Sequence, residues 1–263
     1  MARIASSPPE QVIDLGNGFW NIRGSFKVGP LDVGTHCSLV RLKSGRFVFL
    51  DACELKPETQ TWVRALTGDG ERIDAALHLH PFHTVYVEHL HQLFPQATLH
   101  GTARHVKKLA RLPWSPLLTE GDRLHEQYSE DFRFTVPQGV DFIPANENLH
   151  FASVLALHRE SGAWHIDDTV NYIEFPKVMR FLKEDRLSLH PTLRFVLQER
   201  PGAADEFRRW TQELHDHASE ARHLCAAHSA VLRDQDSSAI RRRITTAVDA
   251  MTGIMSRHKK KYG

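Results

Sequence analysis

The sequence predicts a single α/β domain over residues 1–263, with a helical C-terminal portion. Strand-like apolar runs alternate with helical segments up to about residue 168, and helical periodicity dominates after residue 172. No internal repeat or low-complexity linker divides the 263 residues, a length that can bury a substantial core. One domain therefore fits the sequence better than two.

Strands and helices alternate over the first 112 residues. A KSG turn defines a hairpin, and Pro57 and Gly68 mark the two ends of a helix. The expected segments are short strands within 11–24, a hairpin over 37–55, a helix over 56–68, a strand over 72–80, a helix over 84–94, a strand at "ATLHG" and a helix over 102–112.

Two hairpin-like pairs of strands are expected next, in "DFRFTVPQGVDFIPA" and in "HFASVLALHRESGAWHIDDTV", the second with the turn RESG. Helices are then expected over 174–184, 203–217 and 237–256, with a last strand in "HLCAAH". The apolar stripe of the last helix is explained by packing on its own domain, and the oligomeric state stays open.

Charge and composition narrow the class of function. A formal net charge of +1 argues against a nucleic-acid binder and against a membrane-surface protein. Three widely spaced cysteines without CxxC spacing argue against a disulfide framework and favour a reducing cytoplasm. No signal-peptide core and no run of about 18 apolar residues is present. We expect a cytoplasmic protein that binds a small molecule.

The histidines are concentrated in one stretch, "HLHPFHTVYVEHLH". On a strand over 72–80, His78 and His80 would point to the same face near its carboxyl end, and His83 would follow closely. Converging imidazoles suit a divalent metal, zinc first. His89 and His91 lie two apart on a helix, point about 200° apart and cannot share one ion. Hydrogen-bonded loop histidines are the alternative explanation.

The "HLHPFH" segment resembles the HxHxDH signature of the metallo-β-lactamase superfamily, and the order of segments over roughly residues 12–230 is similar. The resemblance implies a four-layer αβ/βα sandwich, with the site at the edge between its two sheets. It also implies a metal-dependent hydrolase. In one respect the sequence departs from the signature: the family's aspartate falls on Phe82, which can neither ligate a metal nor take a proton.

The resemblance implies further ligands downstream. His150 precedes a predicted strand, and Asp168 follows one in "HIDDT", with Asp167 as the fallback and a helix-cap role as the alternative. The last ligand is His228, with His190 as the competitor, whereas Asp51 matches a buried structural aspartate. The implied metal ligands are His78, His80, His83, His150, Asp168 and His228. They would hold one or two ions, zinc first, although iron and manganese accept the same donors.

The implied reaction is hydrolysis of an ester, thioester, lactone, amide or phosphodiester by a metal-activated water. Asp168 and His83 are the candidate catalytic groups. Because Phe82 replaces a carboxylate, the alternative is a catalytically degenerate protein that keeps the fold and acts as a metal-binding or interaction module. Nucleic-acid processing is disfavoured, since no basic–aromatic stripe accompanies the near-neutral charge.

Overall fold

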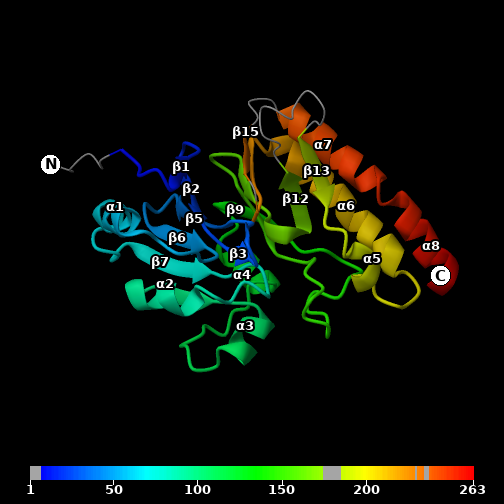
Figure 1. The fold of residues 1–263 in the computed structure, drawn as a ribbon, viewed down its shortest axis with the longest axis horizontal. Helices are drawn as coiled ribbons and strands as arrows, with labels where there is room; N and C mark the ends of the chain where they lie inside the picture. Colours follow the sequence, from blue (N-terminus) through cyan, green and yellow to red (C-terminus); the bar gives the residue numbers. More distant parts are fainter. Residues whose placement is uncertain (1–6, 174–184, 229, 234–236) are drawn as a thin grey trace. The chain divides into compact units, whose positions relative to one another are not determined.

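The computed structural model describes residues 7–173, 185–228, 230–233 and 237–263. These residues form two compact units, Met1–Asp131 and Phe132–Gly263, here called the N-terminal and C-terminal units. Each has a mixed sheet flanked by helices (Figure 1). The predicted α/β class is therefore confirmed, including the helical C-terminal portion. That the two units behave as one domain stays a prediction.

The N-terminal unit contains a six-stranded sheet in the order β1-β2-β5-β6-β7-β8. Neighbours from β1 to β6 are antiparallel, whereas β6, β7 and β8 run parallel. The predicted hairpin of residues 37–55 is confirmed as β5 and β6. The strands are β1 (Val12–Asp14), β2 (Phe19–Gly24), β5 (Thr35–Arg41), β6 (Phe47–Leu50), β7 (Ile73–Leu77) and β8 (Thr98–His100), and a small hairpin adds β3 (Lys27–Val28) and β4 (Leu31–Asp32).

Helices cover one face of this sheet. Trp62 of α1 (Pro57–Thr67) and Leu90 of α2 (Val87–Leu93) pack in one core with Phe47 and Phe49 of β6. The predicted helix over 56–68 is confirmed, and it ends at Gly68, which has φ 66°. Two short helices follow, α3 (Ala103–Lys108) and α4 (Asp122–Gln127).

The C-terminal unit contains a five-stranded sheet in the order β15-β14-β11-β10-β9. β10 and β11 form the hairpin predicted around RESG, and β14 runs parallel to β11. A separate hairpin, β12–β13, follows a single 3-10 turn, η1 (Asp167–Thr169). The strands are β9 (Phe132–Thr135), β10 (Leu155–His158), β11 (Ala163–His165), β12 (Val170–Ile173), β13 (Arg186–Leu189), β14 (His223–Cys225) and β15 (Val231–Arg233).

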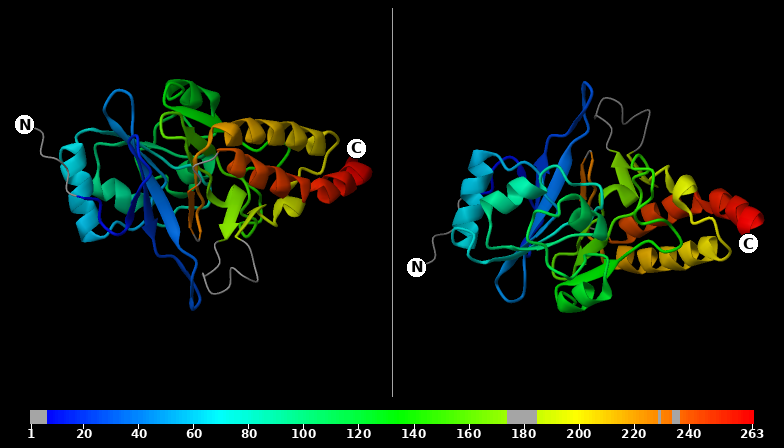
Figure 2. Two further views of the ribbon diagram at one scale, coloured as in Figure 1. Left: turned by 90° about the horizontal axis from the view of Figure 1, so that it is seen from above. Right: turned by 90° about the horizontal axis from the view of Figure 1, so that it is seen from below.

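Helices α6 (Ala203–Glu220) and α7 (Ser237–Asp249) lie side by side in this unit (Figure 2). Their residues Phe207, Trp210 and Ile244 share a core with Trp164 of β11. A short α5 (Leu193–Val196) precedes them, and α8 (Thr252–Tyr262) ends the chain. The prediction of one helix over 237–256 is wrong at its middle, because α7 ends at Asp249 and α8 starts at Thr252.

The strand predicted over 72–80 ends at Leu77. The His78 amide still donates to the His100 carbonyl at 2.9 Å, but the next two amides turn to the Asp51 carboxylate. A side chain thus captures the backbone donors that would have continued the ladder. The prediction that His78 and His80 lie on one strand face is therefore wrong.

The first predicted hairpin of the second half is also wrong. Only β9 forms there, and it pairs with β10 instead. β9 ends at Thr135, because Pro137 lacks an amide hydrogen and Gly139 has φ 71°, and Val140 forms only an isolated bridge with Leu197. The predicted helix over 174–184 lies outside the described residues. Among the helices described, none has the length and apolar character needed to cross a bilayer.

Candidate metal centre

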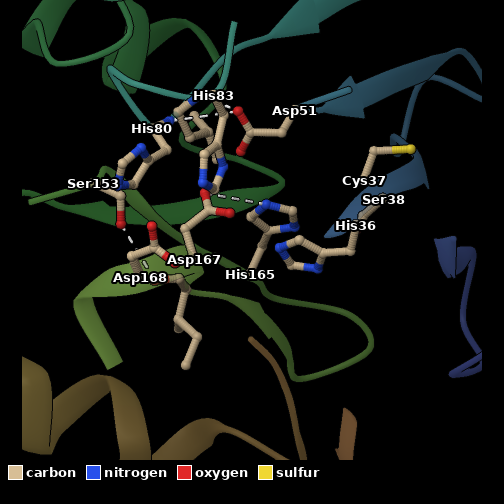
Figure 3. Close-up of polar contacts among 12 residues, drawn as sticks. His36, Cys37, Ser38, Asp51, His80, His83, Ser153, His165, Asp167 and Asp168 are labelled. Atoms are coloured by element: carbon tan, nitrogen blue, oxygen red, sulfur yellow. Dashed lines mark hydrogen bonds and ion pairs between the residues drawn. The ribbon is translucent and has the colours of Figure 1, made fainter. Parts of the chain in front are cut away.

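The "HLHPFH" loop of the N-terminal unit is anchored by Asp51. This buried residue follows β6 and adopts φ 56°, a conformation that side chains other than glycine rarely take. Its Oδ1 accepts the Leu79 amide at 2.9 Å and the His80 amide at 3.4 Å (Figure 3). The structural role expected for Asp51 is thus supported by its contacts, because the carboxylate orients the loop that carries the histidines.

His80 and His83 come together in this loop. Their rings stack with centroids 4.1 Å apart, and they present ligand nitrogens within 4.8 Å of each other. Nδ1 of His80 accepts the Phe82 amide at 3.2 Å, so the ring proton in this arrangement is on Nε2. A metal bound at Nε2 would require the other tautomer, with Nδ1 as donor, and would displace that amide hydrogen bond.

His78 has different surroundings from His80. Its fully buried ring lies 5.5 Å from the His105 ring and edge-on to Trp114 at 5.8 Å. Neither ring nitrogen has a hydrogen-bond partner among the described residues. Burial, followed by the charges of His105 and His100, holds the pKa of His78 well below its usual range. The ring is therefore a neutral imidazole with an unused lone pair.

The ring of Phe82, the fifth residue of "HLHPFH", is covered by Arg104. The guanidinium carbon lies 4.4 Å from the ring centroid, and Nη1 donates to the Pro81 carbonyl at 3.0 Å. Arg104 comes from α3 and is itself buried. A cation–π contact thus helps to fix this part of the loop.

In the C-terminal unit, the η1 turn presents two adjacent buried carboxylates. Thr169 closes the turn, because its Oγ1 accepts the Ser153 amide at 3.0 Å and donates to the Phe151 carbonyl at 2.9 Å. Ser153 Oγ donates to the Ile166 carbonyl at 3.2 Å. Asp167 adopts φ 41° and Asp168 is 3% exposed. These hydrogen bonds position the "DDT" carboxylates at the end of β11.

Asp168 contacts the histidine favoured from the sequence as the last ligand. His228 Nε2 lies 3.2 Å from Asp168 Oδ1. The competitor, His190, is near the same carboxylate: burial lowers its pKa most, Asp168 raises it, and His150 and His228 lower it further. His150 itself donates from Nε2 to the Glu147 carbonyl, so Nδ1 is the ring nitrogen that could ligate a metal. Asp168 and three histidines, at positions 150, 190 and 228, thus interact within this unit.

A second histidine–carboxylate pair was missed from the sequence. His165, the last residue of β11, has Nε2 3.5 Å from Asp167 Oδ2, and both side chains are fully buried (Figure 3). The pattern "HIDD" could have indicated this pair. A histidine at the end of a strand and an aspartate two residues later can contact each other across one tight turn. Asp167, the fallback ligand, is therefore engaged by His165.

The structure brings some predicted ligands together and not others. His80 pairs with His83, and Asp168 pairs with His228. His78 contacts a different set of rings. Imidazole and carboxylate donors of this kind bind zinc, iron or manganese.

The mixed sheets flanked by helices match the metallo-β-lactamase fold. Three of the solved structures that share this fold illustrate the likeness. The DIM-1 metallo-β-lactamase exposed to ceftazidime has a TM-score of 0.57 at 14% identity, over 94% of this chain and 100% of its own. A metallo-β-lactamase from Erythrobacter litoralis with β-mercaptoethanol in its active site has a TM-score of 0.56 at 12% identity, over 90% and 97%.

The third is FIM-1 from Pseudomonas aeruginosa in its mono-zinc form, with a TM-score of 0.53 at 13% identity, over 90% of this chain and 95% of its own. No protein-family model and no curated protein sequence matches the chain. At sequence identities of 12–14%, these structural similarities establish the fold alone.

Proposed function

We propose that this protein is a metal-dependent hydrolase acting on an ester, thioester, lactone, amide or phosphodiester bond of a small molecule. One observation supports the proposal most: within a metallo-β-lactamase-type fold, the imidazole and carboxylate donors are concentrated just after strands β7 and β11. Side chains at strand ends are where α/β folds place their functional groups.

The ligands we propose are the six residues named from the sequence: His78, His80, His83, His150, Asp168 and His228. The donor chemistry fits a metal. His78 is a neutral buried imidazole with no hydrogen-bond partner among the described residues, and Asp168 is a buried carboxylate beside an imidazole. A bound zinc ion would supply Lewis acidity and a water whose pKa is lowered toward about 7.

The chain's own groups have defined tasks in this proposal. Asp168, paired with His228, is the first candidate to accept a proton from the attacking water and pass it to the leaving group, and His83 is the second. Asp51 keeps the histidine loop in place through two amide hydrogen bonds. Phe82 offers no proton acceptor, so the leaving group must be protonated by one of the other groups.

Metal content tests the proposal directly. Protein purified with zinc should contain about one ion or more per chain, and His80→Ala and Asp168→Asn should each lower that content at least severalfold. Matched controls are His89→Ala on α2 and Asp216→Asn on α6, which remove the same chemical groups elsewhere. Wild-type protein that folds without metal, or variants that keep it, would contradict the proposal.

Activity requires a separate test. A panel of aryl esters, thioesters, lactones and bis-aryl phosphates covers most of the proposed bonds. Ceftazidime, to which the structurally similar DIM-1 enzyme was exposed, covers the amide. We expect zinc-dependent turnover of at least one class, reduced about 100-fold or more in Asp168→Asn.

The second candidate function is a catalytically degenerate metal-binding or interaction module. Phe82 favours it, because an aromatic ring under Arg104 replaces the carboxylate of the signature. The His80 Nδ1–Phe82 amide bond favours it as well, since it opposes the tautomer that ligates through Nε2. Stoichiometric metal without turnover on the whole panel would support this function over hydrolysis.

We further propose a cytoplasmic location. All three cysteines are buried, and the Sγ atoms of Cys37 and Cys53 lie 3.2 Å apart without a disulfide between them. An unbridged pair of neighbouring thiols fits a reducing compartment.

A further inference from the structure

The C-terminal unit contains a cavity of about 460 Å³ that the proposed metal ligands do not line. It lies among α5, the segment that follows it, and α8. A cavity of this volume matches the size of a small-molecule site.

Three basic side chains and one acidic side chain line the cavity. Arg194, Arg257 and Lys261 contribute positive charge, and Glu199 is the single carboxylate. Among the described residues, neither guanidinium forms an ion pair with a carboxylate, whereas exposed arginines such as Arg111 do. A guanidinium that is not paired with a carboxylate can donate two parallel N–H hydrogen bonds to the oxygens of a phosphate or carboxylate.

Aromatic rings stand beside these charges. Phe195 is 57% exposed, although phenylalanine is usually buried, and Arg194 lies 4.4 Å over its ring. On the opposite element, the Tyr262 ring lies against His258, tilted by 40° with ring centroids 4.7 Å apart. An exposed ring next to an arginine is a platform on which a planar group can stack.

The walls of the cavity are tied to the rest of the unit. Lys259 of α8 pairs with both carboxylate oxygens of Asp205 on α6, and His258 Nε2 donates to the Gln198 carbonyl at 2.9 Å. Both contacts lie within two residues of lining groups, so the basic and aromatic side chains project from anchored backbone. A site held in this way loses little entropy when a ligand binds.

We propose that this cavity binds a small aromatic phosphate, of which a nucleoside monophosphate is the fitting size. The guanidiniums of Arg194 and Arg257 bind the phosphate, Lys261 adds charge, and Phe195 stacks on the planar ring. The proposal is independent of the proposed hydrolase function, because none of the six metal-ligand candidates lines the cavity.

Calorimetric titration of the full chain with AMP and with phenyl phosphate tests the proposal. Inorganic phosphate has only the charged group and adenosine has only the aromatic ring, so each should bind at least about tenfold more weakly than AMP. Arg257→Ala and Phe195→Ala should each weaken AMP binding about tenfold or more. Phenyl phosphate binding as tight as AMP binding would identify an aryl phosphate rather than a nucleotide as the shared chemistry.

Lys260→Ala is the matched control, since it removes one positive charge from α8 at an exposed position that does not line the cavity. It should leave AMP binding within about twofold. A circular dichroism melt establishes that each variant folds. No AMP binding at millimolar concentration, or equal losses in Arg257→Ala and Lys260→Ala, would overturn the proposal.

Discussion

At the scale of single residues, Asp51 carries two opposing effects. Its left-handed backbone costs a side chain other than glycine about 1 kcal/mol, whereas its carboxylate satisfies two buried amides. Asparagine tolerates the left-handed backbone and still offers a side-chain oxygen as hydrogen-bond acceptor. Glycine tolerates the backbone but has no acceptor, and alanine has no acceptor and disfavours the backbone conformation.

We therefore expect the free energy of unfolding to fall in the order wild type, Asp51→Asn, Asp51→Gly, Asp51→Ala. The Asp51→Ala variant should lose about 2–3 kcal/mol, and glycine should recover about 1 kcal/mol of that loss. Urea denaturation of metal-free protein measures the order. Equal stability of the asparagine and alanine variants would show that the hydrogen bonds do not anchor the loop.

His217 of α6 is a second residue with a clear physical consequence. Its Nδ1 donates to the Glu213 carbonyl at 2.7 Å, its ring stacks on Trp164, and Nε2 has no partner among the described residues. Burial is the main cause that lowers the pKa of His217 below 6.5. Protonation at Nε2 would place an unpaired charge in the core.

The unfolded chain binds this proton near pH 6.5 and the folded chain binds it only at lower pH, so stability falls as the pH drops below about 6.5. His217→Phe keeps a stacking ring but cannot titrate. We expect the variant to be less stable at pH 8, by about 1 kcal/mol, and to show a flatter decline toward pH 5. Urea denaturation midpoints from pH 8 to pH 5 test this expectation. If stability falls as steeply with pH in the variant as in the wild type, His217 does not cause the decline.

At the scale of elements, the start of α6 depends on glycine for two different reasons. A Cβ at Gly139 would lie 2.1 Å from the Ala203 carbonyl oxygen, so that backbone packs directly on the first residue of the helix. Gly202, the residue before the helix, has φ 81°, and the nearest atom to its Cβ position is Glu206 Oε1 at 4.0 Å. Both glycines have positive φ, but only Gly139 lacks space.

Gly202→Ala should therefore cost only the backbone strain, about 1 kcal/mol, whereas Gly139→Ala should cost about 3 kcal/mol or more. The two variants form a matched pair, because they add the same atom at positive φ beside the same helix. Chemical denaturation of both gives the comparison. Similar losses would show that the chain relaxes around Gly139 without displacing α6.

At the scale of the whole molecule, the residues that the structure describes form two hydrophobic cores, one in each unit. Phe49 is fully buried in the first and Phe207 in the second. Each truncation to alanine should cost about 3–5 kcal/mol.

If the chain is the single domain predicted from the sequence, Phe49→Ala and Phe207→Ala will each shift one common transition. Calorimetry and tryptophan fluorescence together measure it, since each core contains tryptophan. Two transitions, of which each variant shifts only one, would instead show that the units unfold independently and would replace the single-domain prediction.

Several elements were predictable because their signals are local. Pro57 and Gly68 bracket α1, and the KSG turn with its apolar arms specifies the β5–β6 hairpin. The α/β class followed from the same alternation. The end of β7 was not predictable, because it depends on the Asp51 carboxylate, which is distant in sequence. The absence of a hairpin over 136–145 was not predictable either, because it depends on Pro137 and on the positive φ of Gly139.

By itself the sequence determined which residue types are available for chemistry: the histidines of "HLHPFH", the aspartates of "HIDDT" and the phenylalanine at position 82. Only the tertiary structure decided their partners. His80 stacks on His83, His78 turns to His105 and Trp114, and Asp168 meets His228. The physical reason is that spacing along a chain specifies periodicity, whereas ring contacts, tautomers and buried ion pairs depend on residues brought close only by packing.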